Sequence, residues 1–134
     1  MKTVFVDSNV FLRFFTLDDR GQGEKAEALF RKAALGQIKL VTGPPVLFEV
    51  AWVLKAAYNT PRGRIADIIA GIIGMEGIKV TDSDLALDAL KLVTERGHDF
   101  ADACIAVSAA RNAAEIATFN RKHFEKTGVP LHQM

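Results

Sequence analysis

The stretch that most constrains the fold is TVFVDSNVFLRFF, residues 3–15, in which a short strand-like run meets an acidic residue. Residues 3–6 are β-branched, apolar or aromatic, a composition typical of a strand buried on both faces. Asp7 follows directly. A carboxylate there opposes stability unless something pairs with it, but that end of the strands is where ligands bind in open α/β sheets. We therefore interpret Asp7 as the first of several acids that converge to hold a divalent cation.

Strand and helix patterns alternate along the rest of the chain, which at 134 residues has the length of a single domain, 1–134. This order predicts a doubly wound α/β domain with three α/β/α layers and a mainly parallel, four- to five-stranded sheet. An apolar helix at 10–15 must be covered by the domain or by a partner. A later helix, which starts at Thr60 and Pro61, carries isoleucines at amphipathic spacing, namely Ile65, Ile68, Ile69, Ile72 and Ile73. The further strands are predicted at 39–42, 78–80, 116–119 and, as an edge strand, 129–131.

The composition is that of a globular protein, with 49% hydrophobic and 25% charged residues. Lys and Arg total 17 against 16 Asp and Glu, a balance that does not by itself indicate a nucleic-acid binder. The single cysteine, Cys104, excludes an internal disulfide and a cysteine-based zinc site. We expect it to be a small buried side chain. No signal-peptide pattern and no run of about 20 apolar residues is present, so we expect a cytoplasmic protein without a membrane span.

Three polar residues fall at predicted carboxyl ends of strands or just beyond them. Asp7 follows the first strand, Glu49 lies early in the helix after the second, and Asn120 follows the fourth. Asp99 and Asp102 open the helix that precedes the fourth strand, so their reaching the same edge is a further assumption. Carboxylate and amide oxygens suit Mg²⁺ or Mn²⁺ rather than zinc, and clustered carboxylates repel one another without a cation.

Structural roles are open for the same residues. Asp7 can cap the first helix, and Glu49 can form an ion pair with Arg13 or Lys55. Asp99 has the position of a helix cap, the role we favour for it, and this would leave Asp102 in the first turn.

The three histidines, His98, His123 and His132, lack an i, i+4 partner, and we interpret them as surface or loop residues rather than zinc ligands. Neither G-x-S-x-G nor G-x-x-x-x-G-K-[ST] occurs. Serine hydrolase and P-loop nucleotide-triphosphatase functions therefore lack support.

The segments FVDSNVFLRFF, PPVLFEVAWVL, and DFADACIAVSA followed by IATFNRKHF resemble the PIN domain family, and within it the VapC-type toxins of toxin-antitoxin pairs. The resemblance implies a metal-dependent nuclease whose acids lie at the carboxyl edge of a parallel sheet. It places the family's acids on Asp7, Glu49 and Asp102. The fourth family position, commonly Asp, is Asn120. We therefore expect one firm metal position formed by Asp7 and Asp102, with Glu49 reaching it directly or through water, and Asp99 as an additional acid.

The function implied by this resemblance is hydrolysis of RNA phosphodiesters with Mg²⁺ or Mn²⁺. Its implied partners are the RNA substrate, a cognate antitoxin protein that covers apolar helices, and a second copy of the chain in a homodimer. Ser8, Asn9 and Thr118 are candidates for hydrogen bonds that support the site. The cations that could grip the RNA backbone are Arg62, Arg64, Arg121 and Lys122.

Two alternatives are carried alongside the nuclease. Because Asn120 removes one negative charge from the family pattern, the chain could be an inactive PIN scaffold that binds RNA or protein. A haloacid dehalogenase-type phosphatase would use Asp7 as its nucleophile. That enzyme class expects a second Asp where this chain has Asn9, and no suitable downstream Lys and Asp-Asp motif is present.

Overall fold

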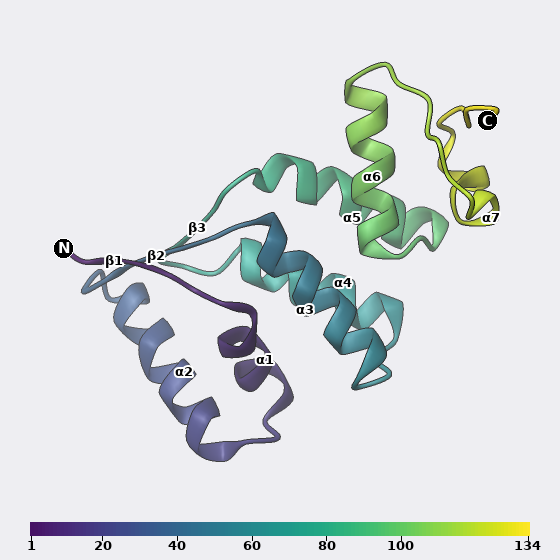
Figure 1. Ribbon diagram of the computed structural model, residues 1–134. Helices are drawn as coiled ribbons and strands as arrows, with labels where there is room; N and C mark the ends of the chain where they lie inside the picture. Colours follow the sequence, from purple (N-terminus) through teal and green to yellow (C-terminus); the bar gives the residue numbers. More distant parts are fainter. The chain divides into compact units, whose positions relative to one another are not determined.

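Three short parallel strands form the sheet of the protein, which we describe from a computed structural model of residues 1–134 (Figure 1). The central strand, β2 (Lys39–Thr42), pairs with β1 (Thr3–Phe5) on one side and β3 (Ile78–Val80) on the other. Leu40 aligns with Val4 of β1 and with Ile78 of β3. The predicted α/β fold, with a parallel sheet flanked by helices, is confirmed.

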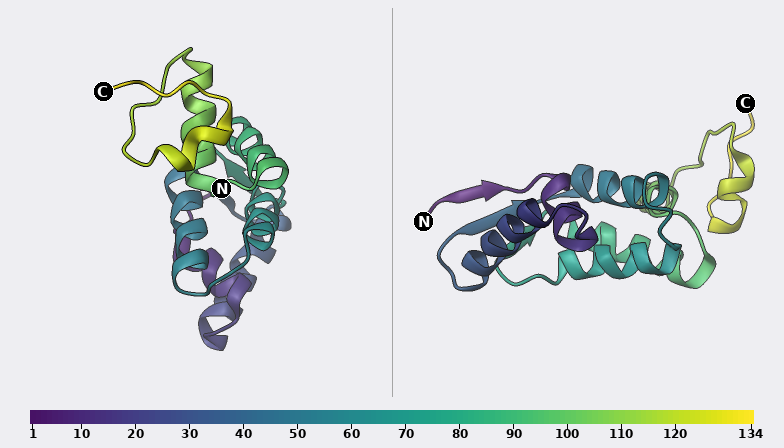
Figure 2. Two further views of the ribbon diagram at one scale, coloured as in Figure 1. Left: turned by 90° about the vertical axis from the view of Figure 1, so that its right-hand side faces the viewer. Right: turned by 90° about the horizontal axis from the view of Figure 1, so that it is seen from below.

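The chain divides into two units, Met1–Ser83 and Asp84–Met134. In the first, α3 and α4 pack against each other and run alongside one another in both turned views (Figure 2). None of the helices in the protein is long and apolar enough to span a membrane. The helices of the first unit are α1 (Ser8–Thr16), α2 (Arg20–Ala34), α3 (Pro44–Ala56) and α4 (Arg62–Ile73). The second unit is built on α5 (Ser83–Arg96), α6 (Phe100–Arg111), α7 (Arg121–Phe124) and the 3-10 helix η1 (Glu125–Thr127).

The sheet has three strands rather than the predicted four or five. The segments predicted as strands at 116–119 and 129–131 form a single parallel bridge, Ile116 to Leu131. Ile116 N donates to the carbonyl of Pro130 at 2.9 Å, and His132 N donates to the carbonyl of Ile116 at 2.8 Å. The next acceptor of such a ladder, the His132 carbonyl, is bound by Arg121 Nη1 at 3.3 Å instead. This side-chain contact ends the pairing after one bridge.

Strand β1 is less buried than its composition predicts. It lies at the edge of the sheet, and Phe5 is 61% exposed. Val6, the next residue, is buried and donates its N–H to the carbonyl of Val41 at 2.9 Å, so the pairing with β2 continues as far as Asp7.

The apolar helix α1 is covered within its own unit by α2. Phe11 is fully buried and stacks on Phe30 of α2, with ring centroids 5.4 Å apart. Phe14 meets the same ring edge-on at 5.0 Å, an arrangement that aromatic pairs prefer. The predicted isoleucine face of α4 is also confirmed, with Ile65, Ile68, Ile69 and Ile72 buried.

The second unit has a small core of its own. Its buried residues are Ala106 of α6, Ile116 and Phe124 of α7, with Leu92 and Leu131 among the partly buried residues packed against them.

Cys104 is buried, as expected from its type, and burial raises the pKa of its thiol to about 12. A thiol with that pKa stays protonated at neutral pH, which suits a packing role.

Gly77 allows α2 to approach the sheet closely. Its φ of +85° is in the left-handed region, and its carbonyl accepts a hydrogen bond from Leu40 N at 3.2 Å in the central strand. A Cβ at this position would collide with the backbone carbonyl of Ala33 in α2. Both the conformation and the space therefore require glycine.

We predict that Gly77→Ala lowers the free energy of unfolding by about 2 kcal/mol or more, because it adds left-handed strain to an overlap with backbone atoms. The measurement is urea unfolding followed by the fluorescence of Trp52. Gly63→Ala is the control, since its Cβ would meet nothing within 4 Å in the first turn of α4. That variant should be unchanged or more stable by up to about 1 kcal/mol. Equal stabilities of the two variants would contradict the prediction.

Candidate functional site

Asp7 stands where the chain leaves the sheet and enters α1. It occupies the N-cap position with extended backbone, and its carbonyl accepts a hydrogen bond from Val10 N at 3.2 Å. Its side chain makes no capping hydrogen bond. The carboxylate is exposed and has no protein partner, so the interpretation of Asp7 as a side-chain cap is wrong. Its oxygens are open to a ligand.

Ser8 connects the start of α1 to Glu49 of α3. Its side chain is buried, and its hydroxyl donates to Oε1 of Glu49 at 2.8 Å. The two strand ends that precede these helices are also joined, because the Thr42 hydroxyl donates to the carbonyl of Val6 at 3.1 Å. The structure therefore brings Glu49 to the residue next to Asp7, as the parallel-sheet argument predicts. The predicted hydrogen bond from Ser8 to a candidate ligand is therefore present, and its role in a site stays a prediction.

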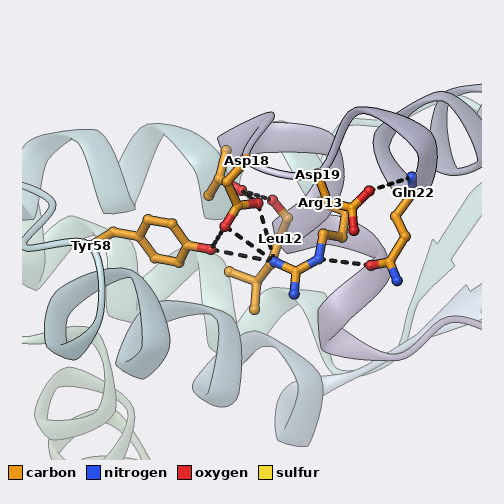
Figure 3. A network of polar contacts seen from close by, with 7 residues as sticks. Leu12, Arg13, Asp18, Asp19, Gln22 and Tyr58 are labelled. Atoms are coloured by element: carbon orange, nitrogen blue, oxygen red, sulfur yellow. Dashed lines mark hydrogen bonds and ion pairs between the residues drawn. The ribbon is translucent and has the colours of Figure 1, made fainter.

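Arg13, one of the two cations considered as partners for Glu49, is bound elsewhere. Its Nε donates to Gln22 at 2.8 Å, and its Nη1 donates to Asp18 at 3.2 Å and to the Tyr58 hydroxyl at 3.4 Å (Figure 3). The prediction of an ion pair between Glu49 and Arg13 is therefore wrong. The contacts join the end of α1 to α2 and to the segment after α3.

Asp18 is the acidic centre of the same network. The Tyr58 hydroxyl donates to it (Figure 3). The Thr16 hydroxyl also donates to it, at 2.9 Å. These hydrogen bonds, with the nearby charge of Arg13, hold the pKa of Asp18 below its ordinary value. Asp19 caps α2 by accepting from Gln22 N at 3.0 Å. Asp18 thus stabilises the turn between α1 and α2, and Asp19 serves as a helix cap.

In the second unit, α6 and α7 bring Asp102 close to the turn that carries Asn120. Asp102 lies in the first turn of α6, and its Oδ2 is 3.5 Å from Nδ1 of His123 in α7. The backbone N–H of His123 donates to the Asn120 carbonyl at 3.1 Å, and Asn120 N donates to the Thr118 hydroxyl at 3.0 Å. Thr118 therefore supports the turn of Asn120.

His123 is the neighbour of Asp102 that sequence reasoning missed. Its side chain is 58% exposed, as a surface residue should be, yet it touches a predicted ligand. The only sequence signal is its place three residues after Asn120, in the single turn of α7. An i, i+4 search does not detect such a contact.

Asp99 and His98 depart from their expected roles. Asp99 has the N-cap position of α6, and its carbonyl accepts from Ala103 N at 2.9 Å, but its side chain makes no capping hydrogen bond. His98 lies in the loop between α5 and α6, which the prediction of a surface or loop residue allows, but it is 8% exposed and its Nε2 has no hydrogen-bond partner, so it is not a surface residue. Its burial depends on packing, which spacing alone does not show.

The predicted ligands share one electrostatic property. Asp7 has no protein partner, Glu49 is bound by a neutral hydroxyl, and Asp102 is next to a histidine. None of the three is paired with a lysine or arginine. Their oxygens fit a hard cation such as Mg²⁺ or Mn²⁺. No three His, Cys, Asp or Glu residues are grouped to hold a metal ion, so the site shared by Asp7, Glu49 and Asp102 stays a prediction.

A parallel sheet with Asp7 and Glu49 beyond its strand ends defines an α/β protein with a candidate site at that edge. The family model of the PIN domain matches residues 4–130, and the chain belongs to the PIN domain family. Among curated proteins, none matches the chain. PIN domains are generally nucleases, and nucleases of this family typically use divalent metal ions. This assignment leaves the haloacid dehalogenase-type alternative without support.

We predict that the hydrogen bond between Ser8 and Glu49 contributes about 1 kcal/mol to stability. A double-mutant cycle of Ser8→Ala and Glu49→Ala, measured by urea unfolding with Trp52 fluorescence, should give a coupling energy of that size. Ser108→Ala combined with Glu49→Ala is the control, because no hydrogen bond joins those side chains. Additivity of Ser8→Ala and Glu49→Ala within about 0.3 kcal/mol would contradict the contact.

We predict that Tyr58→Phe raises the pKa of Asp18 toward its ordinary value, because the largest cause of the lowering is the Tyr58 hydroxyl. Carboxyl NMR titration measures this shift, and Asp88, whose pKa is lowered by Arg111, should titrate unchanged. Because the pKa of Asp18 is lower in the folded state than in the unfolded state, its ionised form stabilises the fold at pH values above the unfolded pKa. This stabilisation is lost as the pH falls through the folded-state pKa. The stability gap between wild type and variant should therefore narrow on acidification. An Asp18 titration unaffected by Tyr58→Phe would count against the network.

Proposed function

We propose that the chain is a metal-dependent endoribonuclease in which Asp7, Glu49 and Asp102 hold Mg²⁺ or Mn²⁺. Asn120 takes the fourth family position, and Asp99 is an additional acid. The observation that carries this proposal is the match of the PIN domain model to residues 4–130. The proposal is consistent with the surroundings of the three acids, none of which has a lysine or arginine partner. A cation is the natural counter-charge for such a set.

Different side chains of the protein would have different roles in phosphodiester hydrolysis. When bound, the cation supplies an activated water and neutralises charge on the phosphate. Glu49, with Oε1 held by Ser8, would orient or deprotonate the attacking water through its other oxygen. Asp102 is the second candidate for that base. Exposed Arg121 and Lys122 would bind backbone phosphates.

We further propose that this nuclease is the toxin of a VapBC-type pair and forms a homodimer. A cavity of about 430 Å³ between α1 and α2 supports an antitoxin partner, because a helix or tail could insert apolar side chains there. A gene for a small protein beside this one, and growth arrest relieved by its co-expression, would be the expected signs. Residues lining this cavity are Asn9, Val10, Arg13, Gln22, Lys25, Ala26 and Leu29.

We predict that single-stranded RNA is cleaved in the presence of Mg²⁺ or Mn²⁺ and that EDTA abolishes cleavage. Asp7→Asn and Asp102→Asn should each lower the rate by about 100-fold or more, because each removes a charge that the cation needs. The measurement is gel analysis of an end-labelled RNA. Asp67→Asn, on the exposed face of α4, is the matched control and should cleave like wild type.

Three results would count against parts of the proposal. Unchanged cleavage by Asp7→Asn would remove Asp7 from the site, and cleavage that survives EDTA would remove the metal. Binding of RNA by the wild type without cleavage would favour the inactive scaffold. That alternative follows from Asn120, which removes one negative charge from the family pattern.

A further inference from the structure

Phe119 is an aromatic side chain that the fold leaves almost wholly in water. It is 93% exposed, more than any other large hydrophobic residue of the chain. Single exposed apolar residues are common and need no explanation by themselves. The position of Phe119 is what makes it informative, because it directly precedes Asn120, at the fourth family position of the proposed site.

The backbone around Phe119 is held in place on both sides. Before it, Ile116 is bridged to Leu131, and after it, Asn120 N donates to the Thr118 hydroxyl at 3.0 Å across the bend. The ring is therefore presented from a fixed turn rather than from a free tail. A group fixed in this way loses little conformational entropy when it binds.

The residues that follow Phe119 are cationic. Arg121 and Lys122 are both exposed, and Arg121 is anchored to the His132 carbonyl at 3.3 Å. Sites for single-stranded nucleic acid combine these two elements, an exposed aromatic face and cations along the backbone. The chain neighbours of Phe119, Thr118 and Asn120, are polar residues that can hydrogen-bond to a nucleotide.

We propose that Phe119 is a stacking platform for an unpaired base of the RNA substrate, with Arg121 and Lys122 on the adjoining phosphates. That the bound RNA is also the substrate rests on the proposed ribonuclease function. Every base has a π-face, so this contact favours single strands without selecting a sequence. A base inside a duplex is already stacked on both sides and is not available to Phe119.

The test measures binding separately from cleavage. The probe is a fluorescein-labelled single-stranded RNA of about 12 nucleotides, a length in the range of such sites, with EDTA present, because stacking and phosphate contacts do not need the metal. We expect Phe119→Ala to weaken binding by about 5- to 150-fold, the equivalent of 1–3 kcal/mol per stacked base. Phe119→Trp and Phe119→Tyr should bind like wild type, whereas Phe119→Leu should bind like Phe119→Ala.

A spectroscopic readout distinguishes stacking from a merely structural role. An RNA that carries 2-aminopurine should lose fluorescence on binding wild type and Phe119→Trp, and should lose less on binding Phe119→Ala. Leu35→Ala, which removes a residue 67% exposed at the end of α2, is the control and should change neither readout. Thermal unfolding of each variant should match wild type, because Phe119 contributes little to the core.

The outcomes separate this proposal from the nuclease proposal. Binding that depends on Phe119, without cleavage in Mg²⁺, would overturn the nuclease and keep the stacking site. Cleavage of RNA by the wild type, together with unchanged RNA binding by Phe119→Ala, would keep the nuclease and overturn the stacking site. Wild-type binding retained by Phe119→Leu, or no binding of single-stranded RNA by the wild type, would overturn the stacking platform.

Discussion

The hydrogen bond from Ser8 to Glu49 is the contact on which the arrangement of the candidate residues in the first unit depends. It joins residues 41 positions apart, and it exists because β1 and β2 are neighbours whose carboxyl ends point the same way. Thr42 strengthens that arrangement by binding the carbonyl of Val6. A parallel pair of strands thus determines that α1 and α3 begin side by side. The placement of Glu49 next to the Asp7 segment follows from the sheet and needs no special loop.

Sequence reasoning succeeded where the signal is local. The strand before Asp7 and the isoleucine face of α4 can each be recognised within a few residues. It failed for the predicted strand at 116–119, because a ladder depends on its partner. There, the His132 carbonyl that would continue the ladder is bound by Arg121. A side chain from the following helix decided the outcome, and no propensity scale contains that information.

The second unit shows the same division between local and packing-dependent features. The place of Asp102 in the first turn of α6 could be predicted from the D-x-x-D spacing, and so could the N-cap position of Asp99. The contact of Asp102 with His123 and the burial of His98 could not, because both depend on how helices pack. Positions along one helix are encoded locally, whereas the groups that face a side chain are a property of the fold.

Some acids of the chain are paired with arginines, and others are not. Asp18 is bound by Arg13, and Asp84 and Asp88 are both bound by Arg111, at 3.2 and 2.7 Å. The chain therefore has arginines available and uses them to neutralise acids that have no predicted site function. Asp7, Glu49 and Asp102 have no lysine or arginine partner, and they share this property with other acids such as Asp67. Pairing the three with fixed cations would occupy the oxygens that a metal ion requires, so the lack of such pairs is a condition for metal binding rather than a proof of it.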